Sequence, residues 1–307
     1  MYAEKFINAF NEGYQSLVDN KIIEEVQYLE ENNDRPTQIG VEKNFTTGTH
    51  KVAFLYFNNN EFFDTEDLIK SELQGRAITK VNFFENKKLS ETAYYFDITL
   101  IENSYDRDDV IRKKIKENYD NWNDYSKEFF TYTLNCFDGQ HDTILSGISF
   151  NTEKNINSLV CYTYPNGDFD NCKKIIEKLC DLYNITSSEK NKSNLNKFIE
   201  KIFPILSDST IKLSFEISHT KDNQKEISLI VHPIVNDFRH DVVKSTADLL
   251  VEANLLDELS AKQLDIWQPE RVVDSNPSNG RLKGYLKIKI LNDDEFKVEV
   301  LSCYGVV

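Results

Sequence analysis

The chain has 307 residues, of which 40% are hydrophobic and 28% are charged, an ordinary balance for a globular protein. Its formal net charge of −15 comes from 51 acidic and 36 basic residues, and no concentrated basic run interrupts the acidic balance. Because proteins hold phosphate backbones with clustered lysines and arginines, this composition argues against a partner that is a nucleic acid.

Targeting and membrane segments are not visible. Residues Met1 to Phe10 have neither the basic region nor the apolar run of a signal peptide, and nowhere do about 18 apolar residues follow one another. The cysteines are odd in number and lack the spacing of a metal site: Cys136, Cys161, Cys172, Cys180 and Cys303. We therefore expect a cytoplasmic protein that does not enter a membrane.

Helices and paired strands alternate through the first half of the chain. The expected helices are Ala3 to Glu31, a short one from a cap at Asp64 or Thr65 through Leu73, and one from a cap at Ser104 or Asp106 through Tyr119. The expected strands are Ile39 to Phe57 with a turn at Thr47-Gly48, then Lys80 to Glu85 and Ala93 to Ile101, which are joined at Asn86-Lys87-Lys88.

The second half repeats this order. The expected strands are Phe129 to Phe137, Thr143 to Asn151, Ser158 to Tyr164, Thr210 to Ser218, Glu226 to Pro233, Leu282 to Leu291 and Glu295 to Ser302. The expected helices are Phe169 to Tyr183, a second from a cap at Ser193 to Phe203 before Pro204, and a third from Asp237 to about Leu259.

The resulting order is α-ββ repeated about five times. Parallel βαβ folds have single strands separated by helices, so this order predicts an α+β protein with an antiparallel sheet and helices packed on one face. The 10 glycines and 6 prolines are spread thinly and form no linker, which favours a single domain over residues 1–307.

Polar and apolar residues alternate along three of the strands. Six apolar residues are expected beneath the helices: Phe96, Ile98, Leu213, Phe215, Leu286 and Ile288. Two arrangements of the sheet are compatible with a polar opposite face. Either the sheet is open and its second face is wetted by solvent, or it closes into a barrel whose polar face lines a lumen. About ten strands would leave a lumen wide enough for a substrate.

Several segments share a hairpin style. Val81 to Asn103 (VNFFENKKLSETAYYFDITLIEN) includes a strand with Asp97 and Thr99 in the pattern x-Asp-φ-Ser/Thr-φ, and Ile144 to Pro165 ends in LVCYTYP. The hairpin STIKLSFEISHTKDNQKEISLIVHP and the helix Val242 to Leu259 follow. Over most of Lys80 to Leu291, this order resembles the ABBA aromatic prenyltransferases, the PT-barrel enzymes. The chain departs from that family at Ser158 and Leu159, where a basic residue would be expected.

The resemblance implies a closed barrel with helices outside and an aromatic prenyltransferase, whose partners are a prenyl diphosphate and a small aromatic acceptor. It implies that the diphosphate is bound by Lys212, Lys287, Lys289 and Arg281, and that Asp97 holds Mg²⁺. It implies that the residues beside the reacting carbocation are Tyr95, Thr99, Tyr162, Tyr164 and Tyr285. The acceptor, the prenyl chain length and the oligomeric state are left open.

A second class of function also fits. The strong acidic balance and a sheet with one helix-covered face suit a non-catalytic binding or immunity-type protein that neutralises a basic partner protein. A closed lumen containing lysine and tyrosine favours the enzyme, and an open acidic sheet favours the binding protein.

Overall fold

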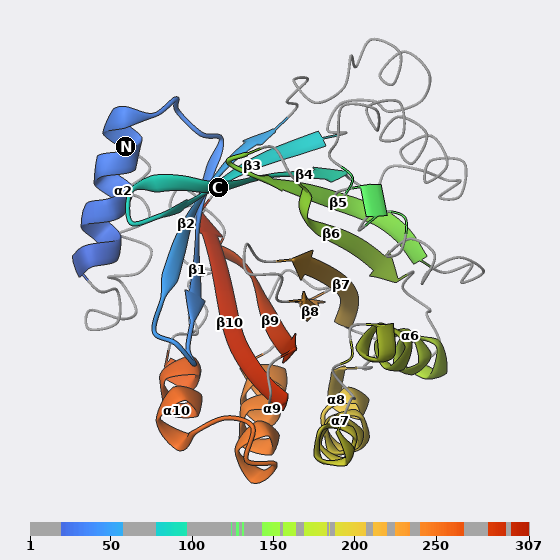
Figure 1. Cartoon of the computed structure of the whole chain (residues 1–307). Helices are drawn as coiled ribbons and strands as arrows, with labels where there is room; N and C mark the ends of the chain where they lie inside the picture. The colour runs from blue at the N-terminus through green and yellow to red at the C-terminus, as the bar shows by residue number, and fades with distance from the viewer. Residues whose placement is uncertain are drawn as a thin grey trace.

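The computed structural model describes residues 20–57, 78–96, 143–153, 156–163, 169–182, 188–206, 211–219, 225–233, 240–266, 282–292 and 296–306, together with residues 124, 127, 128, 131 and 184. Strands occupy the middle of the molecule and helices lie around them (Figure 1). The strands are β1 (Gln38–Asn44), β2 (His50–Phe57), β3 (Ile78–Glu85), β4 (Lys88–Phe96), β5 (Thr143–Asn151), β6 (Ile156–Thr163), β7 (Ile211–His219), β8 (Lys225–Pro233), β9 (Leu282–Asn292) and β10 (Phe296–Val306).

Each of these ten strands pairs with two antiparallel neighbours. The order is β1-β10-β9-β8-β7-β6-β5-β4-β3-β2, and β1 also pairs with β2, so the hydrogen-bonded sheet returns to its start as a closed barrel. Five hairpins make up the barrel: β1–β2, β3–β4, β5–β6, β7–β8 and β9–β10. Because all neighbouring strands are antiparallel, the hairpin turns lie at one end of the barrel and the longer connections lie at the other.

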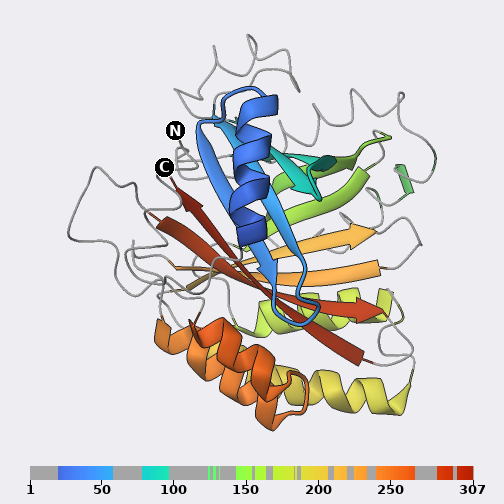
Figure 2. The ribbon, with the colours of Figure 1, turned by 90° about the vertical axis from the view of Figure 1, so that its left-hand side faces the viewer.

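The helices are α2 (Asn20–Asn32), α6 (Phe169–Leu182), α7 (Glu189–Lys201), α8 (Phe203–Leu206), α9 (His240–Glu252) and α10 (Glu258–Ile266). α2 lies across β1 and β2, whereas α6, α7, α9 and α10 gather on another side of the strands (Figure 2). None of the helices in these ranges is long and apolar enough to span a membrane.

The main core lies between the strands and the helices. Alternate strand residues face away from the lumen, and among them Val41 on β1, Phe215 on β7 and Ile288 on β9 are fully buried. The helices contribute Ile176 and Phe198, which are equally buried. Burial of such side chains contributes about 1.5–3 kcal/mol each, so this layer supplies much of the driving force for folding.

Polar contacts fix α2 to two hairpins. The Glu25 carboxylate lies 2.9 Å from Nε2 of His50 on β2, and its other oxygen accepts the backbone N–H of Lys87 at 2.7 Å. Lys87 and Asn86 have φ values of 65° and 50°, the left-handed pair that a two-residue hairpin turn requires. The Lys87 ammonium lies 4.8 Å from the ring centroid of Tyr28 on α2.

The α+β class, the antiparallel sheet and the order of helices and hairpins are confirmed. Phe215, Leu286 and Ile288 are fully buried, as expected. The side chains of Phe96 and Leu213, and all of Ile98, lie outside the described residues.

Several boundaries differ from the prediction. β4 begins at Lys88 rather than at Ala93, because the tight turn at Asn86 and Lys87 lets pairing start at once. The helix expected from Asp237 to Leu259 is two helices, since Asn254 has a φ of 58° and ends the first.

Two further elements are corrected. The N-cap of α7 is Ser188, whose hydroxyl accepts the N–H of Asn191 at 3.1 Å, and not Ser193, which lies within the helix. The strand expected over Phe129 to Phe137 is wrong at Thr131, which is helical, as are Asp124, Lys127 and Glu128. The helices expected near Asp64 and Ser104 lie outside the described residues.

Candidate functional site

A cavity of about 300 Å³ lies inside the barrel, close to the hairpin turns. Side chains of β1 to β5 and β7 to β9 line it: Glu42, Lys51, Phe83, Glu85, Ser90, Glu91, Tyr95, Asn151, Glu216, Ser218, Glu226, Tyr285, Lys287 and Lys289. They alternate in sequence with the buried apolar residues of the outer layer, because neighbouring strand residues point to opposite faces. Charged and polar side chains make up most of this lining, and the rings of Phe83, Tyr95 and Tyr285 are its apolar part.

Lys287 is the most enclosed of the three lysines that line the cavity. Its side chain is 8% exposed, and its ammonium lies 3.0 Å from both carboxylate oxygens of Glu216 on β7 and 3.9 Å from Glu42 on β1. Tyr285, two residues earlier on β9, donates its hydroxyl hydrogen to Glu42 at 2.8 Å. The Lys287 group, which consists of Lys287, Glu216, Glu42 and Tyr285, therefore connects three strands across the lumen.

The charges of Glu42 and Lys287 are maintained by their neighbours. Burial alone raises the pKa of Glu42, but Lys287, Lys51, Lys289 and the hydrogen bond from Tyr285 together bring that pKa below its ordinary value. Burial alone lowers the pKa of Lys287, and the carboxylates of Glu216 and Glu42 more than offset this, so its pKa is raised. Near neutral pH the pair is ionised.

A second lysine on β9 has its own carboxylate. The ammonium of Lys289 lies 3.2 Å from Glu226 on β8, and the same oxygen accepts the hydroxyl of Ser218 at 3.3 Å. Ser228 lies opposite Glu216 and Lys289 in the strand register, which puts it on the inner face. Ser228 is fully buried, and its hydroxyl has no hydrogen-bond partner among the described residues.

A third group, formed by Lys51 and its carboxylate partners, is more exposed than the groups of Lys287 and Lys289. The ammonium of Lys51 on β2 lies 3.1 Å from Glu85 on β3 and 3.8 Å from Glu91 on β4. Side-chain exposure is 31% for Lys51 and 46% for Glu85, so this group lies toward solvent. Burial lowers the pKa of Lys51, but the carboxylates of Glu91, Glu42 and Glu85 more than offset this, and the net shift of its pKa is upward.

A β-bulge places residues of β4 in the cavity. The register between β3 and β4 shifts at Phe83 and Phe84, and the hydroxyl of Ser90 donates to the backbone carbonyl of Phe83 at 3.0 Å. An extra residue in one strand re-aims its neighbours, and both Ser90 and Glu91 line the cavity as a result.

An apolar cluster on β2, β3 and β4, the apolar wall, adjoins the cavity and reaches its lining through Phe83 and Tyr95. Ala53, Val81, Phe83 and Ala93 pack together there, with Leu55 and Tyr95 against them. Tyr95 lies directly opposite Gly147 on β5, where a Cβ atom would come within 2.8 Å of the tyrosine ring. Glycine at position 147 therefore leaves room for the Tyr95 ring on this wall.

Four of the sequence-predicted site residues line the cavity: Tyr95, Tyr285, Lys287 and Lys289. Lys212 and Tyr162 belong to β7 and β6, but their side chains are outside the described part of the chain. Asp97, Thr99, Tyr164 and Arg281 are outside it altogether. Mg²⁺ binding by Asp97 thus stays a prediction, and within the described ranges no three metal-binding side chains lie close enough together to hold an ion.

Sequence reasoning missed the acidic side chains of the site. Glu42, Glu85, Glu91, Glu216 and Glu226 all line the cavity, and alternation alone places Glu216 only on a polar strand face. The alternation of Ile39 and Val41 with Gly40 and Glu42 on β1 is the signal that would have found the first of them.

In comparisons with known proteins, no family model and no curated protein sequence matches this chain.

Proposed function

We propose that this chain binds a small organic molecule in the lumen of its barrel. The observation that carries the proposal is the 300 Å³ cavity, whose mostly charged lining also includes the rings of Phe83, Tyr95 and Tyr285. Ligand pockets are typically concave, start at about 300 Å³ and combine apolar surface with a few convergent polar groups. This size suits a molecule with one ring and a short polar chain.

The energetics of the charged wall support this proposal. A buried ion pair is often no more stabilising than apolar residues of the same volume, so folding alone does not require Lys287 and Glu216 inside the barrel. Groups with shifted pKa values in a cleft are more typical of binding and catalytic sites.

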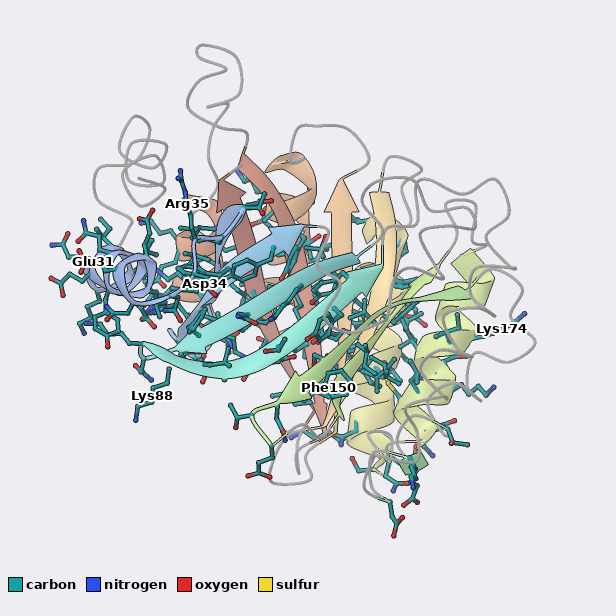
Figure 3. The ribbon with its side chains drawn as sticks, turned by 90° about the horizontal axis from the view of Figure 1, so that it is seen from above. Glu31, Asp34, Arg35, Lys88, Phe150 and Lys174 are labelled. Carbon is teal, nitrogen blue, oxygen red and sulfur yellow. The ribbon has the colours of Figure 1, made fainter. Side chains whose placement is uncertain are left out.

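The proposal is tested by blocking the cavity. Asn151 lines it near the β5–β6 turn, whereas Lys174 is exposed on α6 at the outside of the molecule (Figure 3). We would titrate phenethylamine, phenethyl alcohol, phenylpropanoate and a geranyl thiolodiphosphate into the wild type, Asn151→Trp and Lys174→Trp by calorimetry.

At least one probe should bind saturably to the wild type and to Lys174→Trp, and its affinity should fall at least about tenfold in Asn151→Trp. Circular dichroism spectra and melting temperatures of the three proteins would show that the fold is intact. Saturable binding of no probe, or binding that is unchanged in Asn151→Trp, would contradict a ligand site in this cavity.

Prenyl transfer is the second candidate, and one specific observation favours it. The helix–hairpin order, the antiparallel barrel and the inward positions of Tyr95, Tyr285, Lys287 and Lys289 are the arrangement that resembles a PT-barrel enzyme. In that chemistry the allylic C–O bond breaks, the diphosphate leaves with the electron pair, and an aromatic carbon forms a bond to the carbocation before it loses its proton. Aromatic faces such as Tyr95 would stabilise the cation.

Prenyl transfer ranks second because the lysines of the cavity are already paired with carboxylates. The ammonium groups of Lys51, Lys287 and Lys289 all lie within 4 Å of carboxylates, so a diphosphate would have to displace those carboxylates. Incubation with dimethylallyl, geranyl or farnesyl diphosphate, Mg²⁺ and a panel of phenols and indoles should give a prenylated product by mass spectrometry. A product whose yield is unchanged in Lys287→Met would exclude Lys287 from diphosphate binding.

The neutralisation of a basic partner protein is a third candidate, and it comes from composition. The inner polar face of this sheet lines a cavity and does not form a broad exposed surface, which gives that candidate no specific support.

A further inference from the structure

The lysine groups in the cavity differ in how firmly they are held. Lys287 is 8% exposed between Glu216 and Glu42, whose side chains are 12% and 5% exposed. Lys51 is 31% exposed and lies nearer to Glu85 than to Glu91. A lysine on a flexible four-carbon stem can turn out into water more readily at this exposure than when it is enclosed. Lys51 is therefore the ammonium group that leaves most easily.

If the Lys51 ammonium turned out into water, the carboxylates of Glu85 and Glu91 would remain next to apolar surface. Glu91 lies directly opposite Phe83 in the β3–β4 register, and Glu85, two residues after Phe83, lines the same cavity. Phe83 is 8% exposed and belongs to the apolar wall with Tyr95. An ammonium group attached to a ring or an alkyl chain matches this combination of negative charge and aromatic surface.

The charge balance of the cavity favours the same sign. Among the described residues, its lining includes five carboxylates, those of Glu42, Glu85, Glu91, Glu216 and Glu226, and three ammonium groups, those of Lys51, Lys287 and Lys289. The protein as a whole has a net charge of −15. The described lining and the protein as a whole therefore both have an excess of negative charge, which favours a cation over an anion.

We propose that the ligand of this cavity is a primary amine with an aromatic or alkyl body, and that its ammonium group replaces that of Lys51 between Glu85 and Glu91. This inference rests on the proposed function and adds the charge and position of the ligand. Lys51 then competes with the ligand, because its own ammonium group occupies the cation subsite until a ligand binds. Its role is to keep the two carboxylates paired in the empty protein.

Three variants test the subsite against phenethylamine. Lys51→Met removes the competitor and should tighten phenethylamine binding about five- to tenfold. Glu85→Gln and Glu91→Gln keep the size of the side chain and should each weaken it about tenfold or more. Lys88→Met is the matched control, since it removes one positive charge from the same hairpin but lies outside the cavity at the periphery of the molecule (Figure 3).

The probes separate the two proposals. Phenethylamine should bind more tightly than phenethyl alcohol, which should bind more tightly than phenylpropanoate. Tighter binding of the acid or of geranyl thiolodiphosphate, lost in Asn151→Trp, would overturn the cation subsite and leave the ligand site in place. Binding of phenethylamine that Lys51→Met weakens would also overturn the subsite. If no probe binds the wild type, the proposed function itself fails. Melting curves of Glu85→Gln, a half-exposed position, guard against loss of binding through misfolding.

Discussion

Ile288 and Lys287 are neighbours on β9, yet they belong to opposite layers of the barrel wall. Ile288 is fully buried on the outer face, whereas Lys287 points into the lumen with a side chain that is only 8% exposed. Both side chains are hidden from most of the solvent, so burial alone does not distinguish the layers. The outer layer is held by apolar contact, and the inner layer is held by particular partners such as Glu216 and Glu42.

This difference predicts which layer tolerates amino-acid substitutions. Apolar packing is non-directional, so a residue of similar volume often replaces another at small cost. An ion pair in the lumen requires both partners, since a charge left alone there is strongly unfavourable. Selection for stability alone would simplify the inner layer, and the ligand site proposed above would give its charges a reason to be retained.

Ile288→Lys should have the largest effect. It places an ammonium group without a carboxylate in the apolar layer, and a loss of more than about 4 kcal/mol in the free energy of unfolding is expected. Urea denaturation followed by circular dichroism would measure it. Ile288→Val is the control, with an expected loss of about 0.5–1.5 kcal/mol. A stably folded Ile288→Lys protein would show that the two layers do not differ as described.

Lys287→Met should come next. It leaves Glu42 and Glu216 buried without their ammonium partner, and breaking a buried pair in this way costs about 3–5 kcal/mol. The free energy of unfolding in urea near neutral pH is the measurement. Lys289→Met should cost less, because Lys289 is 18% exposed and has Glu226 as its carboxylate partner. Equal losses would mean that exposure does not govern the inner layer.

Glu42→Gln should lower stability in a pH-dependent way. The pKa of Glu42 is below its ordinary value, so the ionised carboxylate stabilises the folded state above the unfolded pKa, and this contribution is lost as the pH falls through the folded pKa. Near neutral pH the variant should lose about 1–3 kcal/mol, as expected for hydrogen bonds to a charged group.

The difference between wild type and Glu42→Gln should shrink as the pH falls well below the ordinary value of 4.5. Urea denaturation at several pH values would follow it. A difference that stays constant with pH would assign the effect to packing and not to the charge of Glu42.

Gly147→Ala should have the smallest effect on stability, about 1–2 kcal/mol, because its Cβ atom would press on the Tyr95 ring. The displaced ring should also narrow the cavity and weaken phenethylamine binding. Calorimetry of folding and of binding would measure both. The double variant Gly147→Ala with Tyr95→Leu should recover part of the stability; no recovery would place the strain elsewhere, for example at the Tyr94 carbonyl 3.3 Å away.

The sequence predicted which residues lie in the outer and inner layers better than it predicted which side chains pair across the lumen. Alternation along β7 and β9 predicted that Phe215 and Ile288 are buried, because strand geometry fixes the face of each residue. Pairing across the lumen joins Lys287 to Glu216, which is 71 residues away in the chain, and to Glu42, which is farther still. No local pattern encodes such contacts.

Local backbone conformation explains the errors in element boundaries. The left-handed conformations of Asn86, Lys87 and Asn254 tighten one hairpin and divide one helix, and neither asparagine nor lysine demands that conformation. The bulge at Ser90 was likewise invisible, and it is the feature that brings Glu91 to the cavity.

The pairing of β1 with β10 has a consequence for how the chain reaches this structure. The five hairpins join strands that are close in sequence, and they can form early and quickly. The ring cannot close until β10, the last of the ten strands in the chain, meets β1 from the far end of the sequence. Until then the growing sheet has two unpaired edges, which are prone to pair with other chains. Closure late in folding, and aggregation of chains cut before Phe296, are therefore expected.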